Sequence, residues 1–194
     1  MYIYGCNAIL AMVIINRSDK DMIRDFSEYT IDLKIEGINP GFHFIYNKAT
    51  TALKMGMTTM DINYQLVPLI NHRAHNGERA IQTFKNNFIV GQCTIYKDLY
   101  FQLWDRLLQQ ETISLNLLSK SRIRPRLSAY THIFGEFYYN RTTLCPPETR
   151  LVIHNRQKYI TLWAPHIEHV WYIGPDMGRF QTFKNNFIVV QCTI

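Results

Sequence analysis

Cysteine is scarce in this chain, and its spacing excludes the commonest zinc modules. The 194 residues include four cysteines, at positions 6, 93, 145 and 192, and no two of them form a C-x-x-C pair. A zinc ribbon needs such closely spaced ligand pairs, so none is expected. Isolated thiols are also typical of a reducing compartment rather than of a disulfide framework, which favours an intracellular location.

Long hydrophobic runs are absent as well. No apolar stretch approaches the roughly 20 residues that a helix needs to cross a bilayer. The opening stretch, MYIYGCNAILAMVII, is apolar but has neither a basic start nor a small-residue cleavage pattern at its end, so it predicts a short β region rather than a signal peptide. The sequence therefore gives no reason to expect a membrane partner.

Acidic residues are few in the last part of the chain. Residues 1–119 hold 11 Lys+Arg and 11 Asp+Glu, whereas residues 120–194 hold 10 and 4, so the second part accounts for the whole formal charge of +6. The densest cluster lies in the segment SKSRIRPRLS and consists of Lys120, Arg122, Arg124 and Arg126. A locally basic segment is the footprint of phosphate binding. A solvated basic surface without a partner remains the alternative.

The first 67 residues alternate between strand-like and helix-like patterns. Ser18 is placed as an N-cap for a helix over 19–36, which Gly37 ends. A second helix is predicted over 49–60. Apolar or β-branched runs predict strands over 8–15, 41–47 and 62–67. Strands that alternate with helices indicate an α/β layer with a mostly parallel sheet.

Two more helices and a β unit are predicted downstream. Ile81, Phe84 and Phe88 form one apolar stripe of a helix that has Glu78 in its first turn, where a carboxylate suits the positive end of the helix dipole. A long helix follows over 99–120, and it is expected to pack on the sheet or on the Glu78 helix. Its wide apolar stripe comprises Leu103, Trp104, Leu107, Leu108, Leu115 and Leu118. From Thr149 on, short apolar runs between turn residues indicate a small antiparallel β unit.

One segment occurs twice. Residues 82–95 read QTFKNNFIVGQCTI and residues 181–194 read QTFKNNFIVVQCTI, so that only Gly91 and Val190 differ. A single distant copy with unrelated flanks is not a solenoid repeat. The second copy is interpreted as a duplicated tail without an assigned role. Val189 and Val190 raise its strand tendency, so it need not fold as the first copy does.

Several segments of the sequence resemble the integrase region of copia-type retrotransposon polyproteins. They run in order up to about residue 178 and include INYQLVP (62–68), HRAHNGERAIQTFKNNFI (72–89), LWDRLLQQETISLNLL (103–118), SRIRPRLSAY (121–130) and WAPHIEHVWYIGP (163–175). The resemblance implies a truncated RNase H-like three-layer core with a mixed sheet, a long helix and a small antiparallel β unit. The division expected is a core over 1–119, a basic linker over 120–148, a β unit over 149–180 and the duplicated tail over 181–194.

The resemblance also implies a site and its chemistry. Glu78 matches the last carboxylate of an Asp, Asp, Glu triad that holds two Mg²⁺ (or Mn²⁺) ions for DNA strand transfer. Tyr46 stands where the second Asp is expected, and the first Asp belongs to a strand that precedes the matching text. A phenol is protonated near neutrality and is a poor magnesium ligand, and two metals need several converging carboxylates.

These observations lead to one functional hypothesis and two alternatives. The chain is expected to be an integrase-derived fragment that lacks strand-transfer activity, binds no metal and retains sequence-independent duplex DNA binding through Lys120, Arg122, Arg124 and Arg126. The alternatives are a relic open reading frame without activity and a non-catalytic basic DNA-binding module. The resemblance also implies a possible oligomer, and a nuclear location if the chain is functional.

Overall fold

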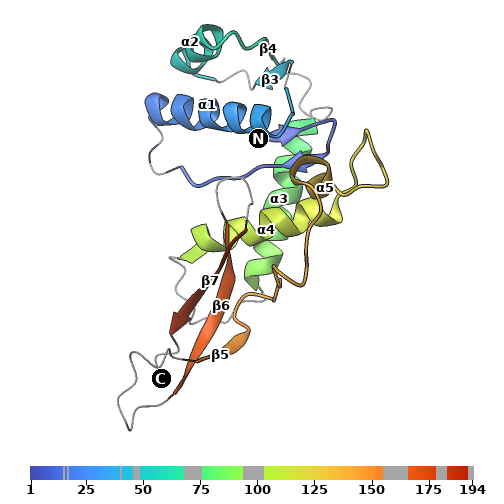
Figure 1. Cartoon of the computed structure of the whole chain (residues 1–194). Helices are drawn as coiled ribbons and strands as arrows, with labels where there is room; N and C mark the ends of the chain where they lie inside the picture. The colour runs from blue at the N-terminus through green and yellow to red at the C-terminus, as the bar shows by residue number, and fades with distance from the viewer. Residues whose placement is uncertain are drawn as a thin grey trace.

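The computed structural model describes residues 1–14, 16, 18–39, 41–45, 49–67, 76–93, 103–154, 166–177 and 183–191. Within them the chain is mixed α/β, with five helices and seven strands in three small sheets. Figure 1 shows an elongated arrangement, in which α1 and α2 lie at one end, the sheet β5-β6-β7 at the other and α4 between them. None of the described helices combines the length and the apolar composition that a bilayer crossing requires.

The chain begins with a small antiparallel hairpin. Strands β1 (Tyr2–Ile3) and β2 (Ala8–Ile9) pair with each other, and no other described strand joins them. Within 8–14, the described part of the strand predicted over 8–15, only Ala8 and Ile9 are regular strand, although Ala8 and Leu10 are buried. The outer backbone groups of Ile9 are satisfied by Asn116 of α4, whose side-chain amide donates to the Ile9 carbonyl and accepts from its N–H, both at 2.8 Å.

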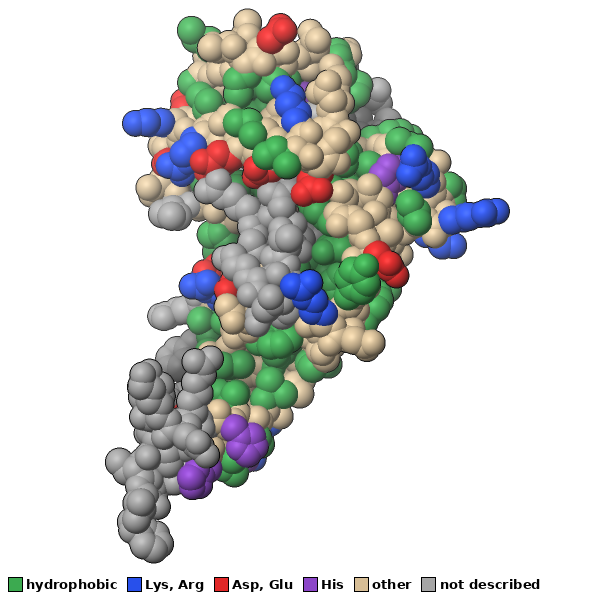
Figure 2. All heavy atoms as spheres, viewed as in Figure 1, with side chains coloured by type: hydrophobic (Ala, Val, Ile, Leu, Met, Phe, Trp, Pro, Cys, Tyr) green, Lys and Arg blue, Asp and Glu red, His purple; other side chains and the backbone are tan. Residues whose placement is uncertain are grey.

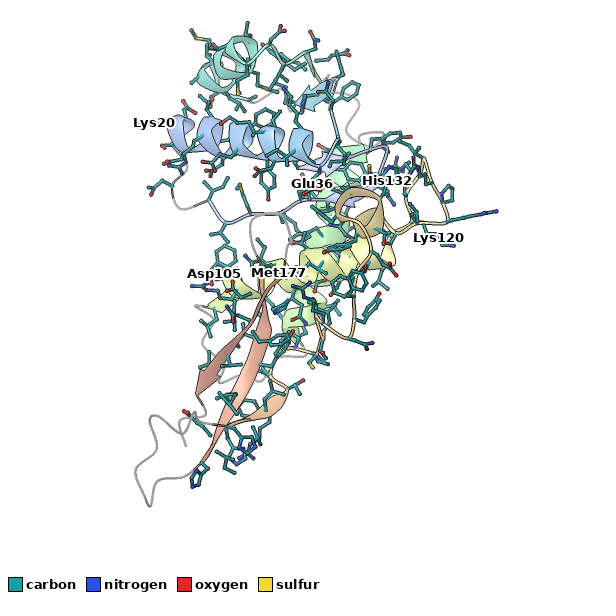
Figure 3. The ribbon with its side chains drawn as sticks, in the orientation of Figure 1. Lys20, Glu36, Asp105, Lys120, His132 and Met177 are labelled. Atoms are coloured by element: carbon teal, nitrogen blue, oxygen red, sulfur yellow. The ribbon has the colours of Figure 1, made fainter. Side chains whose placement is uncertain are left out.

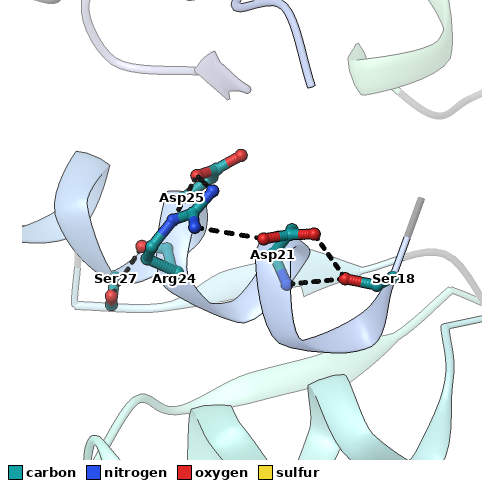
Figure 4. Close-up of polar contacts among 5 residues, drawn as sticks. All are labelled: Ser18, Asp21, Arg24, Asp25 and Ser27. Carbon is teal, nitrogen blue, oxygen red and sulfur yellow. Dashed lines mark hydrogen bonds and ion pairs between the residues drawn. The ribbon is translucent and has the colours of Figure 1, made fainter. Parts of the chain in front are cut away.

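Helix α1 (Asp19–Ile35) confirms the prediction made from its caps. The Ser18 hydroxyl accepts the N–H of Asp21, and Gly37 takes a positive φ of 78° after the last turn. Figure 4 shows how Arg24 lies between Asp21 and Asp25, with nitrogen–oxygen distances of 3.1 and 3.2 Å. Arg24 therefore neutralises both carboxylates along the helix.

The next elements form the parallel pair that the α/β pattern predicted. Helix α2 (Thr51–Thr59) begins at the N-cap Thr50 and packs against α1. Strands β3 (His43–Ile45) and β4 (Tyr64–Leu66) flank it and pair in parallel. This sheet has two described strands and does not include β2, so the more extended, mostly parallel sheet is not observed among the described residues. The RNase H-like fold stays a prediction.

Helix α4 (Trp104–Leu118) is the element that holds the described parts together. It contacts β2, α5, β6 and α3, the last spanning Asn76–Cys93, so the predicted packing on the Glu78 helix is observed. Leu107, Leu108 and Leu115 are buried as predicted. Two members of the predicted stripe are not, because Trp104 is 42% and Leu118 is 82% exposed at the helix ends. Buried polar residues take part of the inner face instead, namely Gln110, Thr112 and Asn116.

The segment expected to be a basic linker contributes to the core. It contains α5 (Ala129–Phe134), which is capped by the Ser128 hydroxyl and has Ala129, Tyr130 and Ile133 buried. The half-buried Phe134 packs against all three buried apolar clusters, which join α5 to the N-terminal hairpin, to α1 and to α4 with β6. The basic linker predicted over 120–148 thus contains a helix that packs on the core, and the division of the chain into units stays a prediction.

The C-terminal sheet is antiparallel, as predicted, but it includes the duplicated tail. Its order is β5-β6-β7, with β5 at Arg150–His154, β6 at Ile167–Met177 and β7 at Phe183–Gln191. Residues 183–191 of the tail copy thus form a strand paired along β6, whereas residues 82–93 of the first copy lie in helix α3. The expectation that the second copy need not fold as the first does is confirmed.

Candidate nucleic-acid interface

The basic segment forms a closed loop with a defined backbone. Residues 120 and 128 form an antiparallel bridge at its base, next to the hydrogen bond from the Ala129 N–H to the Ser119 carbonyl at 2.7 Å. Ser121 makes two hydrogen bonds within the loop. Its N–H donates to the Leu127 carbonyl, and its hydroxyl accepts from the N–H of Arg124. Ser121 is 2% exposed and lies 2.7 Å from Nδ1 of His132. These bonds fix the loop to the start of α5.

The N-terminal hairpin turn supports the same loop from the other side. The Gly5 carbonyl accepts the N–H groups of Arg122 and Ile123 at 3.1 and 3.2 Å. The turn also lies close against Ile123, because a Cβ added at Gly5 would lie 2.8 Å from Cδ1 of Ile123, whose exposed side chain would have to shift. Asn7 donates from its amide to the Lys120 carbonyl at 3.0 Å. The loop therefore docks on the hairpin through backbone groups, which leaves its basic side chains outside.

Arg122 is held by two tyrosines of the hairpin turn. Its guanidinium carbon lies 4.3 Å from the centre of the Tyr4 ring, and Nη2 donates to the Tyr2 hydroxyl at 2.9 Å. Desolvation lowers the pKa of Arg122, but the hydrogen bond and the charge interactions with the two phenols outweigh it and raise that pKa, so the group stays cationic. Tyr4 itself is 56% exposed. A cation stacked on an exposed ring is a surface suited to an anionic, flat-faced partner.

All four predicted basic residues are exposed on this loop. Figure 2 shows Lys and Arg side chains gathered where the loop projects, and Figure 3 places Lys120 and His132 near its base. Within the described part of the chain, no carboxylate forms an ion pair with any of the four. Their charge is therefore available to a ligand, and the arrangement can place several cations along a phosphate backbone.

Glu78 occupies the predicted place in the first turn of α3 and is half-buried. Tyr46, which stands at the second triad position, lies outside the described residues. Over the ranges that the structure describes, no group of three or more His, Cys, Asp or Glu side chains is placed to hold a metal ion. One triad carboxylate does not fit a pair of magnesium ions. The expectation that no metal binds stays a prediction.

The aromatic and histidine residues in and near the C-terminal sheet differ in their exposure. Tyr172 is 1% exposed, its hydroxyl donates to the Thr143 carbonyl at 3.3 Å, and burial raises its pKa to about 12. It belongs to the core rather than to a base-stacking surface. Trp171 is half-buried between Arg150 and Val190 in the register, and His166 and His169 are exposed. Trp163 lies outside the described residues.

Sequence reasoning missed the contribution of the hairpin turn to the basic loop. Tyr2, Tyr4, Gly5 and Asn7 lie more than a hundred residues before the loop that they contact. Periodicity reports on one element at a time, so it carries no signal for such a pairing. The only hint was composition, since two tyrosines and a glycine precede the first buried residues.

Comparisons with known proteins do not assign the chain to a family. No protein-family model matches the chain, and no curated protein matches it either.

Proposed function

We propose that this chain is an integrase-derived fragment that binds nucleic acid through the loop 119–129 and does not carry out strand transfer. The segments that resemble copia-type integrases occur in the same order as in that family, which supports an integrase origin. The observation that carries the binding role is the basic loop itself, where Lys120, Arg122, Arg124 and Arg126 project from a backbone fixed at both sides.

The expected recognition is of phosphates rather than of base sequence. Four cations on one short loop can follow a phosphate backbone, and each phosphate contact made releases condensed counterions. Tyr4 beneath Arg122 adds a ring at the same surface. Phosphate contacts position a protein on a duplex but carry no sequence information by themselves, so duplexes of different sequence should bind alike.

The test is a salt titration of binding to a fluorescent duplex, followed by anisotropy. Replacing Arg122, Arg124 and Arg126 by alanine should lower the affinity and reduce the slope of log K against log salt by about 2.7, at about 0.9 for each lost phosphate contact. The matched control replaces Lys20, Lys34 and Lys85, which are exposed elsewhere on the chain, and changes the net charge by the same amount. Equal weakening by both triple variants would contradict a local binding surface.

The absence of strand transfer has its own experiment. Purified protein is incubated with Mg²⁺ or Mn²⁺ and a duplex, and nicking and joining are followed on denaturing gels. We expect no metal-dependent product. Activity that is lost in Glu78→Gln and kept in Gln82→Glu, a neighbouring exposed position on α3, would overturn this part of the proposal.

A further inference from the structure

The same nine residues adopt two conformations in this chain. Residues 84–92 lie in helix α3, and their copy, residues 183–191, forms strand β7. The single difference within these nine positions is Gly91 against Val190. A side chain at Gly91 would be tolerated, since an added Cβ would lie 3.4 Å from a flexible Glu111 carboxylate. The local sequence therefore permits both states, and the neighbours select between them.

Two apolar residues of the helical copy are more exposed than their counterparts in the strand copy, although Phe88 is half-buried and Phe187 is 41% exposed. Ile89 and Val90 in α3 are 56% and 64% exposed. Their counterparts Ile188 and Val189 are half-buried beside β6, where Val189 lies opposite Tyr172. Exposed apolar area costs free energy in proportion to its size, and Ile89 and Val90 would be less exposed in the positions that Ile188 and Val189 take.

We propose that the edge of β6 that pairs with β7 can also pair with residues 84–92 of another copy of the chain. In this exchange the incoming segment replaces β7 in the same register. Every cross-strand neighbour is then reproduced except one, where Gly91 stands opposite Trp171 in place of Val190. Backbone pairing provides affinity in such strand addition, and alternate side chains provide specificity. The exchange links chains into homo-oligomers and does not depend on nucleic-acid binding.

The repeat allows a test in which one substitution has opposite effects at its two positions. The full-length chain is followed by size-exclusion chromatography with light scattering over a range of concentrations. Val90→Lys weakens the incoming segment and should lower the dimer fraction, whereas Val189→Lys weakens β7, frees β6 and should raise it. Gly91→Val makes the incoming strand identical to β7 and should tighten the dimer about fivefold, from the strand preference of valine over glycine. Effects of the same sign at both positions, or a monomer at every concentration in Gly91→Val, would overturn the proposal.

A disulfide trap covers the case in which a lysine variant does not fold. One preparation carries Gly91→Cys and the other Trp171→Cys, and both carry Cys93→Ser to remove an exposed neighbouring thiol. The register predicts a covalent heterodimer between positions 91 and 171, identified by mass spectrometry. The matched control places the cysteine at Gln92, one residue out of register and facing the opposite side of the strand. A yield from position 91 no higher than from position 92 would refute the exchange.

Discussion

Replacing Asn116 by alanine should destabilise the protein more than any other single truncation of a polar side chain on α4. Asn116 is 1% exposed, and its amide makes two hydrogen bonds of 2.8 Å to the backbone N–H and carbonyl of Ile9. The side chain thus pairs with the backbone of Ile9 as an adjacent strand would. Alanine removes both bonds and leaves the N–H and carbonyl of the half-buried Ile9 without this partner.

The magnitude follows from the cost of leaving buried polar groups unpaired. Each such group costs about 1–3 kcal/mol, so two groups give an expected loss of about 2–4 kcal/mol after partial relaxation. Urea unfolding followed by tryptophan fluorescence measures this loss as a shift of the midpoint at constant slope. Asn87→Ala is the matched control, because its amide also bonds one carbonyl, that of Thr83, but on the exposed face of α3.

We expect the control to change the free energy of unfolding by less than about 0.5 kcal/mol. Asn116→Asp separates the two bonds, since the carboxylate keeps an acceptor for the Ile9 N–H and loses the donor to the carbonyl. It should also be destabilising, because the charge is buried. A value for Asn116→Ala within 0.5 kcal/mol of the control, measured under identical conditions, would refute the reasoning.

Three further predictions concern other parts of the chain. Ser18→Ala removes the N-cap of α1 and should cost about 1 kcal/mol in urea unfolding, while Ser27→Ala, on an exposed hydroxyl bonded to the Arg24 carbonyl, should cost less. Leu33→Ala, at a fully buried position in the cluster with Leu10 and Tyr29, should cost about 2–5 kcal/mol, and a smaller loss than for the exposed Leu118→Ala would contradict that packing. Burial lowers the pKa of His43 below 6.5, so the folded state binds fewer protons than the unfolded state just below that value. Stability should therefore fall as the pH drops through this window, and His43→Phe should show a weaker fall between pH 7.5 and pH 5.

The sequence predicted helix α1 well because its signals are local. Ser18 and Gly37 mark the two ends within a few residues of the helix, and the structure places both as expected. Tyr29 and Leu33 also face inward, because a 3.6-residue period describes an isolated element correctly. Caps and periodicity are properties of one segment, so they can be read without knowledge of its neighbours.

Long-range partners set the limits of the same reasoning. The inner face of α4 includes Gln110 and Asn116, which a hydrophobic stripe does not select, because their amides bond backbone groups of Cys145 and Ile9. The repeat is the clearest case, since nine nearly identical residues give α3 in one place and β7 in the other. No local rule can assign both, because β6 decides the second.

The candidate site was predicted in part. Exposure of Lys120, Arg122, Arg124 and Arg126 follows from a run of charge, and the structure confirms it. The hydrogen bonds from the loop backbone go to the Gly5 carbonyl, and the ring beneath Arg122 is that of Tyr4; composition could not connect either residue to the loop. The sequence thus predicts the charge of the four residues but not the contacts of the N-terminal hairpin that hold their loop.

Helix α4 has a consequence for the order in which the chain can fold during synthesis. The helix ends at Leu118, yet one side of it packs on β6, which begins at Ile167. While the ribosome makes the intervening residues, Ile113 has no Met177 to pack against, and the growing chain exposes an apolar surface. Such transient surfaces favour association between nascent chains and recruitment of chaperones. Slow translation between 119 and 166 should therefore lower the yield of folded protein more than slow translation after 177.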